Sequence, residues 1–336
     1  MIINFLIIIQ VKMKENIVLI CDDNYAMPTA VTIESIIENA NMRCTVNVFT
    51  VELSKINIDM LERLSNDKVT IIVHKVDVEK YKDKLDKINQ KTHVSPAALI
   101  KFELCNLFPS NVKRVLYIDS DIIIKDSLEK LFKLDLEGYL LAASFEFWNY
   151  VVNIRENSDY SIPKFYFNSG VMLMNLEEFR KNNISTELWE EKIRQSQDPN
   201  NKSILMDQDV FNTICSQKCK PLDIMYNFNP QFSRNELVRI EWINKIYHSK
   251  YNSVDQLFDD AHIIHYVGKE DKPWKYLSGM YRELWDKYYV KAGFDLKLLK
   301  RKNIKHGVRF YYSRLVYYVK KNGIVGMVKY LKNNYL

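Results

Sequence analysis

The stretch Val-Leu-Tyr-Ile-Asp-Ser-Asp at residues 115–121 joins four apolar residues to two carboxylates. Consecutive apolar residues predict a strand that is buried on both faces, as in a parallel sheet. Asp119 and Asp121 follow this strand, and residues two apart in an extended chain point to the same side. Because ligands bind beyond the carboxyl ends of parallel strands, this stretch predicts both the sheet and the position of a site.

Strands and helices alternate on either side of this stretch. We expect strands at 16–21, 45–51, 69–73, 112–118, 139–144, 171–174 and 262–267. We expect helices at 28–38, 58–64, 78–88, 96–107, 188–194 and 210–215. The alternation predicts an α/β, Rossmann-like fold, and the absence of a linker predicts one domain over residues 13–295.

Charge is distributed unevenly along the 336 residues. Residues 296–336 hold eleven Lys and Arg and no Asp or Glu, which leaves 37 basic and 42 acidic residues elsewhere, a net charge of −5. A nucleic-acid-binding body would carry its own basic stripe, so the charge argues against this class for the body. Five sparse cysteines indicate a reducing, cytoplasmic compartment. Cys215 and Cys219 lack a second pair to complete a zinc site and are expected in a helix.

Both ends of the chain raise the question of membrane contact. Residues 2–11 are apolar but too few to span a bilayer, so residues 1–12 are expected to be an extension from an upstream start. An extra ordered segment or a weak membrane contact are the alternatives. Residues 296–336 have apolar and aromatic residues at helical spacing between basic ones, which predicts a basic amphipathic helix on the anionic inner face of the cell membrane. The alternative is a helix packed on the domain.

Asp119, Asp121 and His265 are the candidate metal ligands. Paired carboxylates bind hard divalent cations, and a neutral imidazole suits Mn²⁺ better than Mg²⁺ or Ca²⁺. Gly268 allows a backbone N–H to approach a phosphate, and Lys272 adds a point charge. The alternatives are carboxylates on a solvated loop and a structural histidine, which is the interpretation given to His262.

Three further segments have polar groups suited to a nucleotide or a sugar. Asp22 to Tyr25 can hold a base and ribose, or form an ordinary loop. Asn168 and Gly170 can bind sugar hydroxyls, or form a turn. Asp207-Gln208-Asp209 opens a helix, where acidic residues also favour the helix dipole.

Together these segments resemble a known family. They are DDNYA at 22–26, VLYIDSD at 115–121, FNSGVMLMNL at 167–176, DQD at 207–209, and HYVG with KPW between 265 and 274. Over residues 16–274 the chain resembles glycosyltransferase family 8, in particular bacterial transferases of lipopolysaccharide and related surface glycans. The resemblance implies a GT-A type, Rossmann-like mixed sheet flanked by helices. It also implies a UDP-glucose or UDP-galactose donor, Mn²⁺ rather than Mg²⁺, a glycan or glycolipid acceptor, and transfer with retention.

The resemblance also implies a role for individual residues. Asp119, Asp121 and His265 would bind the metal. The donor nucleotide would contact Asp22, Asn24, Tyr25, Lys101, Ser120, Gly268 and Lys272. The sugar would contact Glu146, Asn168, Asp207 and Gln208, with Asp207 and Gln208 as the catalytic residues.

Three positions bear on these roles. Lys101 stands where family members often have Arg, so a point charge replaces a two-pronged donor. The spacing from Gly268 to Lys272 is one residue longer than expected, so the loop is expected to bulge. An amide such as that of Gln208 is a poor nucleophile, which favours attack on the face that UDP leaves over a covalent intermediate.

Other classes of protein remain as alternatives. One is a non-catalytic, membrane-associated binding protein with a transferase-like body. Another is an aspartate-nucleophile phosphatase, but there the D-x-D motif follows the first strand, whereas three strands precede it here. A basic nucleic-acid binder is disfavoured by the acidic body.

Overall fold

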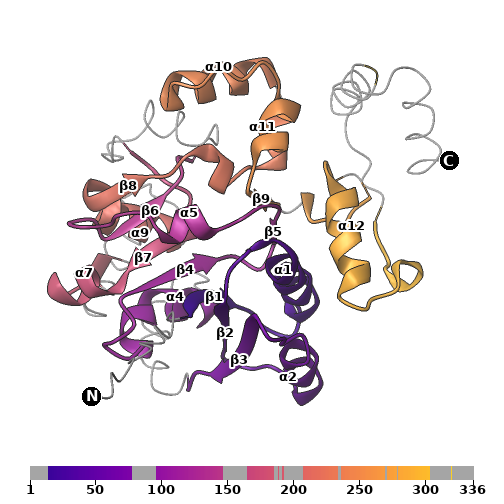
Figure 1. The fold of residues 1–336 in the computed structure, drawn as a ribbon, viewed down its shortest axis with the longest axis horizontal. Helices are drawn as coiled ribbons and strands as arrows, with labels where there is room; N and C mark the ends of the chain where they lie inside the picture. The colour runs from indigo at the N-terminus through magenta and orange to yellow at the C-terminus, as the bar shows by residue number, and fades with distance from the viewer. Residues whose placement is uncertain are drawn as a thin grey trace, which may run out of the picture.

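The central sheet of the molecule has seven strands (Figure 1). The computed structural model describes residues 14–77, 96–146, 165–184, 188, 191–192, 207–233, 236–268, 271–277, 279–302 and 319. The strands are β1 (Glu15–Ile20), β2 (Cys44–Thr50), β3 (Val69–Lys75), β4 (Arg114–Ile118), β6 (Leu141–Ala143), β7 (Val171–Asn175) and β8 (Cys219–Pro221). Their order is β3-β2-β1-β4-β7-β6-β8.

The sheet is mixed, as expected. Strands β1 to β4 are parallel, whereas β7 runs antiparallel to both β4 and β6, and β8 is parallel to β6. A second, two-stranded sheet pairs β5 (Ile122–Ile124) with β9 (Ile263–His265) in antiparallel register. Ile122, which begins β5 shortly after the end of β4, lies opposite His265. The pairing therefore places His265 next to the end of β4.

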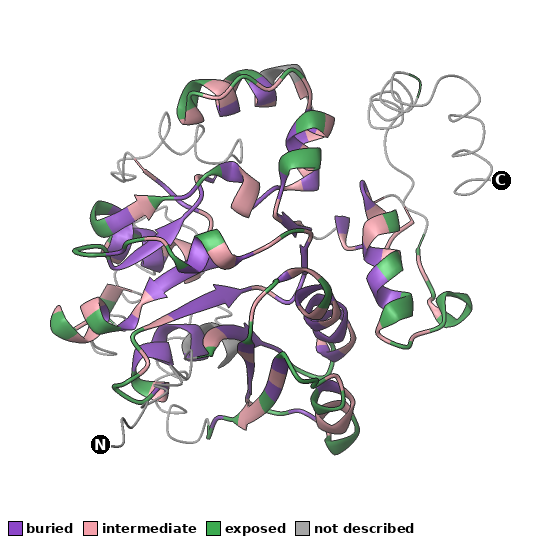
Figure 2. Ribbon diagram, in the orientation of Figure 1, coloured by how far each residue is buried: buried purple, intermediate pink, exposed green. Residues whose placement is uncertain are grey.

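Both faces of the sheet are covered by helices, and its strands are largely buried (Figure 2). The helices are α1 (Ala26–Asn39), α2 (Lys55–Glu62), α4 (Pro96–Leu107), α5 (Glu129–Phe132), α7 (Leu176–Lys181), α9 (Asp207–Cys215), α10 (Glu236–Tyr247), α11 (Val254–Asp260) and α12 (Arg282–Lys291). Short 3-10 turns are η2 (Ser216–Lys218), η3 (Ile224–Tyr226), η4 (Pro230–Ser233) and η6 (Leu296–Leu298).

Alternate residues of the central strands enter different cores. In β4, Val115 and Tyr117 pack with α4, α7 and α9, whereas Leu116 and Ile118 pack with α1, α2 and α5. This two-sided burial is why the strands are apolar throughout. A third core lies under β9 and helices α10 to α12. It packs one face of the two-stranded sheet against these helices, while Ile122, Ile124 and Ile263 join the core that contains α1 and the main sheet.

Most of the expected elements are present within a few residues of the expected bounds. The helix expected at 78–88 lies outside the described residues, and the one expected at 188–194 is described only in part. Cys219 corrects one prediction: it begins β8 rather than lying in a helix, because η2 ends α9 and the backbone then pairs Cys219 with Leu141. All five cysteines are unpaired and buried.

The first residues of the expected basic tail contact the body. Arg301 forms an ion pair with Asp286 of α12 and donates to the carbonyl of Pro273. The backbone of Lys302 forms an isolated parallel β-bridge with that of Tyr276. Residues 1–12 and nearly all of the tail beyond residue 302 lie outside the described residues. No helix in the described part of the chain has the length and apolarity required to cross a membrane.

Candidate active site

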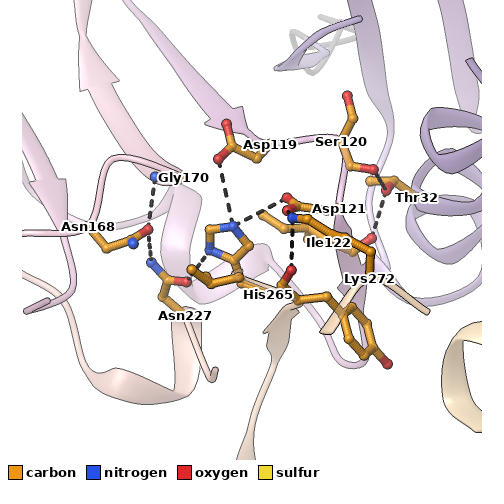
Figure 3. Close-up of polar contacts among 12 residues, drawn as sticks. Thr32, Asp119, Ser120, Asp121, Ile122, Asn168, Gly170, Asn227, His265 and Lys272 are labelled. Atoms are coloured by element: carbon orange, nitrogen blue, oxygen red, sulfur yellow. Dashed lines mark hydrogen bonds and ion pairs between the residues drawn. The ribbon is translucent and has the colours of Figure 1, made fainter. Parts of the chain in front are cut away.

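Asp119, Asp121 and His265 meet at the carboxyl end of β4 (Figure 3). Their potential ligand atoms all lie within 4.8 Å of one another. The Nε2 atom of His265 is 3.2 Å from Oδ1 of Asp121 and 3.6 Å from Oδ2 of Asp119. Within the described residues, no other group of three His, Cys, Asp or Glu side chains gathers in this way.

The chemistry of this cluster fits a divalent cation. Asp121 is buried, and its Oδ1 atom has no hydrogen-bond partner in the described structure. Burial raises the pKa of Asp121, but the positive charge of Lys272 outweighs this and leaves the pKa below its usual value. A carboxylate that is both buried and ionised requires a compensating positive charge. Two carboxylates and an imidazole at this separation supply one nitrogen and several oxygen ligands.

Gly170 packs directly against two of these side chains. A Cβ atom at position 170 would lie 2.2 Å from Cε1 of His265 and 2.7 Å from Oδ2 of Asp119. The backbone of this glycine also accepts a hydrogen bond from the N–H of Asp119 at 2.9 Å. The missing side chain at position 170 therefore makes room for the imidazole.

Lys272 reaches the same cluster from the loop after β9. Its ammonium group forms an ion pair with Oδ2 of Asp121 and donates to the carbonyl of Tyr266 at 2.9 Å. Burial lowers the pKa of Lys272, but the Asp121 carboxylate outweighs it and raises the pKa. The expected bulge falls on residues 269–270, outside the described residues.

Gly268, in the same loop, has a φ of +95°, where L side chains are strained. A Cβ there would lie 2.1 Å from Nε2 of Gln231, which donates to the carbonyl of Val267 and to Asp271. Position 268 therefore favours glycine for its backbone conformation, and a side chain there would displace the amide of Gln231.

A cavity of about 430 Å³ opens beside the cluster. Its lining includes both aspartates of the cluster and five other residues expected at the site or next to it: Asp22, Tyr25, Lys101, Ser120 and Asp207. Tyr25 also meets Trp274 edge to face, at 5.8 Å between ring centroids. Asn24 does not line this cavity; its amide lies 3.5 Å from Asp22.

Two of the lining residues are already engaged within the protein. The Ser120 hydroxyl donates to the carbonyl of Ile20 at 3.0 Å. The buried Lys101 ammonium donates to Asp207 at 2.7 Å and to Ser169 at 3.1 Å, and lies 4.4 Å from the centre of the Tyr117 ring. Lys101 thus neutralises Asp207 at the wall of the cavity.

The residues expected around the sugar also come together. Asn168 donates from Nδ2 to Glu146 at 2.6 Å, and Nε2 of Gln208 is 3.5 Å from the same Glu146 oxygen. The Gln208 carbonyl accepts from the backbone N–H of Ser169 at 3.1 Å. Glu146 and Gly268 both line a second, smaller hollow of about 60 Å³.

Two polar residues of this region are given no role of their own by the sequence analysis, which names Asp209 only as part of the segment 207–209. Asn227 contacts His265 and Asn168 through its side-chain amide. Asp209 accepts a hydrogen bond from the Tyr166 hydroxyl, and burial raises its pKa to about 7. Asn227 lies in an irregular segment between two aromatic residues, Tyr226 and Phe228. The only sign in the sequence that it belongs to the site is that a polar amide stands between two side chains expected to be buried.

A family model confirms the expected relationship. The model of glycosyl transferase family 8 matches residues 16–278, most of the chain. The chain belongs to glycosyltransferase family 8.

Named relatives are similar over much of the chain. The glycosyltransferase GlyF of Streptococcus pneumoniae is 27% identical over 81% of this chain and 61% of its own length. The lipopolysaccharide 1,3-galactosyltransferase of Salmonella typhimurium is 27% identical over 78% of this chain and 73% of its own. This chain therefore spans about three fifths of the length of GlyF.

A solved structure gives the same fold. The galactosyltransferase LgtC, in complex with donor and acceptor sugar analogs, aligns with a TM-score of 0.61 at 21% identity, covering 83% of this chain and 95% of that one. At this identity the match establishes the GT-A fold.

Proposed function

We propose that this protein is a metal-dependent, retaining hexosyltransferase. It transfers glucose or galactose from a UDP-sugar to a hydroxyl of a bacterial surface glycan or glycolipid. The observation that carries this proposal is the convergence of Asp119, Asp121 and His265 beside a cavity of about 430 Å³. The similarity to a lipopolysaccharide galactosyltransferase supports the choice of acceptor class.

Asp119, Asp121 and His265 would hold Mn²⁺. The imidazole nitrogen favours Mn²⁺ over Mg²⁺ or Ca²⁺, which prefer oxygen ligands throughout. The metal would act as a Lewis acid on the departing diphosphate. Next to it, Asp22 and Tyr25 line the cavity where we place the uridine, with Asn24 beside Asp22.

Lys272 and Gly268 are assigned to the diphosphate. A lysine ammonium carries a single charge, and in this structure that charge is paired with Asp121. Lys272 can turn to a phosphate only when another cation neutralises Asp121, so its role depends on the metal. Because Gly268 has no side chain, a phosphate can approach its backbone N–H closely.

Glu146, Asn168, Asp207 and Gln208 are assigned to the donor sugar. Asp207 is tied to Lys101, and the Gln208 carbonyl accepts a backbone hydrogen bond. Neither is set up as a strong nucleophile. We therefore favour attack by the acceptor hydroxyl on the face that the diphosphate leaves, with Gln208 placed to stabilise positive charge on the sugar through its carbonyl dipole.

The C-terminal segment would place the enzyme at its acceptor. Residues 296–336 carry eleven basic and no acidic residues, which suits an anionic membrane surface on the cytoplasmic side. The catalytic domain over residues 13–295 would then work next to a lipid-linked acceptor.

A donor screen tests this proposal. Purified protein is incubated with Mn²⁺ and a panel of UDP-sugars, and release of UDP is measured with and without chelator. We expect metal-dependent hydrolysis of UDP-glucose or UDP-galactose above that of the other sugars. If no UDP-sugar is bound or hydrolysed, the protein is a binding module with a transferase-like body and the proposal is wrong.

A further inference from the structure

Asn227 contacts the candidate metal ligand His265 from the side opposite the two aspartates (Figure 3). We propose that Asn227 is a positioning residue that fixes the tautomer and the orientation of His265. The inference rests on the proposed function in one respect, namely that Asp119, Asp121 and His265 hold a divalent cation.

The orientation of the neighbouring amide, Asn168, is determined from two directions. The backbone N–H of Gly170 can only donate, and it lies 2.9 Å from Oδ1 of Asn168. On the other side, a carboxylate oxygen of Glu146 accepts from Nδ2 of Asn168 at 2.6 Å. Both contacts give the same assignment of oxygen and nitrogen. Oδ1 of Asn168 therefore faces Asn227.

This orientation passes to Asn227 and then to His265. Nδ2 of Asn227 donates to Oδ1 of Asn168 at 3.0 Å, so Oδ1 of Asn227 faces Nδ1 of His265 at 2.9 Å. An amide oxygen only accepts, so the hydrogen of the neutral imidazole sits on Nδ1. Nε2 is then left without a hydrogen and can bind a cation that lies between it and the carboxylates of Asp121 and Asp119.

The backbone holds Asn227 firmly in this place. Asn227 is 5% exposed and follows η3. The next residue, Phe228, donates to Ile263 at 2.9 Å and accepts from the N–H of His265 at 2.8 Å. Because Gly170 packs against Cε1 of the same ring, the imidazole is confined both by an amide and by a close backbone contact.

Two substitutions at position 227 distinguish positioning from simple packing. Asn227→Leu keeps the size of the side chain and removes both hydrogen bonds, whereas Asn227→Asp keeps the acceptor that faces Nδ1. We expect Mn²⁺ binding, measured by calorimetry on the whole chain, to be about 10–100-fold weaker for Asn227→Leu. We expect it to be as tight as wild type or tighter for Asn227→Asp.

A packing role predicts the opposite order of affinities. A carboxylate at this buried position costs far more than leucine when nothing is gained from its acceptor. Weaker Mn²⁺ binding for Asn227→Asp than for Asn227→Leu would therefore overturn the proposal. Asn244→Leu is the matched control, since it removes a side-chain amide bound to the backbone of Tyr251, away from the metal ligands. Its Mn²⁺ affinity should equal that of wild type.

The tautomer is measured directly in the wild-type protein with Zn²⁺ in place of Mn²⁺, because Zn²⁺ is diamagnetic. Long-range proton–nitrogen correlation spectra report which ring nitrogen is protonated, and the signals of His265 are those missing from His265→Gln. We expect a protonated Nδ1 and a metal-bound Nε2; metal bound at Nδ1 with the proton on Nε2 refutes the proposal even if Asn227→Leu does not fold. Since no donor is added, a negative donor screen would refute the proposed function and leave this result standing.

Discussion

Gly170→Ala adds a single methyl group at the point where the backbone meets the proposed metal ligands Asp119 and His265. That methyl carbon would lie 2.2 Å from Cε1 of His265, whereas carbon atoms in contact stand about 3.5–4.0 Å apart. The imidazole must therefore move by more than about 1 Å. Metal–ligand distances tolerate only about 0.2 Å, so the ring can no longer bind the same ion as the aspartates.

The expected result is a large loss of metal affinity with a modest loss of stability. We expect Mn²⁺ to bind at least about 100-fold more weakly, since a ligand is lost rather than an outer contact. Overpacking costs about 1–3 kcal/mol of unfolding free energy. Titration calorimetry with Mn²⁺ measures the first quantity and urea unfolding the second.

Gly279→Ala is the matched control for this substitution. Its added Cβ would have its nearest neighbour, the carbonyl oxygen of Asp271, at 3.5 Å, an ordinary contact. We expect Gly279→Ala to bind Mn²⁺ as wild type does. If Gly170→Ala also binds Mn²⁺ within about threefold of wild type, His265 is not a ligand held against Gly170 and the description of the site is refuted.

The remaining predictions concern pH, the aspartates and the membrane. Asp209 has its pKa raised from 3.8 to about 7, so the folded state keeps a proton that the unfolded chain releases, and stability falls as pH rises between these values. Asp209→Asn should therefore gain about 2–3 kcal/mol over wild type between pH 5 and pH 8 in urea unfolding; an equal gain at both values would contradict this. Asp119→Ala and Asp121→Ala should each abolish Mn²⁺-dependent UDP release, and full activity in either would rule out the metal centre. The whole chain should sediment with vesicles of anionic but not of neutral lipid and be released by salt, and equal sedimentation with both would exclude the electrostatic role of residues 296–336.

The main sheet was predictable because its strands have an unusual composition. Residues 115–118 are apolar on both faces, and the structure buries one face under α4 and the other under α1. The antiparallel direction of β7 could not be predicted from the sequence, because Val171 to Asn175 is as apolar as a parallel strand would be. Cys219 was misplaced for a related reason: a three-residue turn, too short to leave a periodicity, separates a helix from a strand.

The polar side chains of the site were predictable in kind but not in pairing. Asp119 and Asp121 could be found because they end a buried strand, and His265 because glycine, lysine and tryptophan follow it. Asn227 could not, since its partners Asn168 and His265 are 59 and 38 residues away in the chain. The resemblance placed Lys101, in place of an arginine, against the donor nucleotide, but nothing local indicates that Lys101 is already bound to Asp207.

The balance of charge at the cavity explains why these pairings matter for function. Asp22, Asp119, Asp121 and Asp207 line the cavity, against the ammonium group of Lys101 on its wall and that of Lys272 beside Asp121. Both lysines are engaged with carboxylates, so the site by itself repels a diphosphate. A divalent cation placed between Asp119, Asp121 and His265 would cancel this excess of negative charge and free Lys272 for the donor. On the proposed function, recognition of an anionic donor would therefore depend on the geometry that holds Asp119, Asp121 and His265 together.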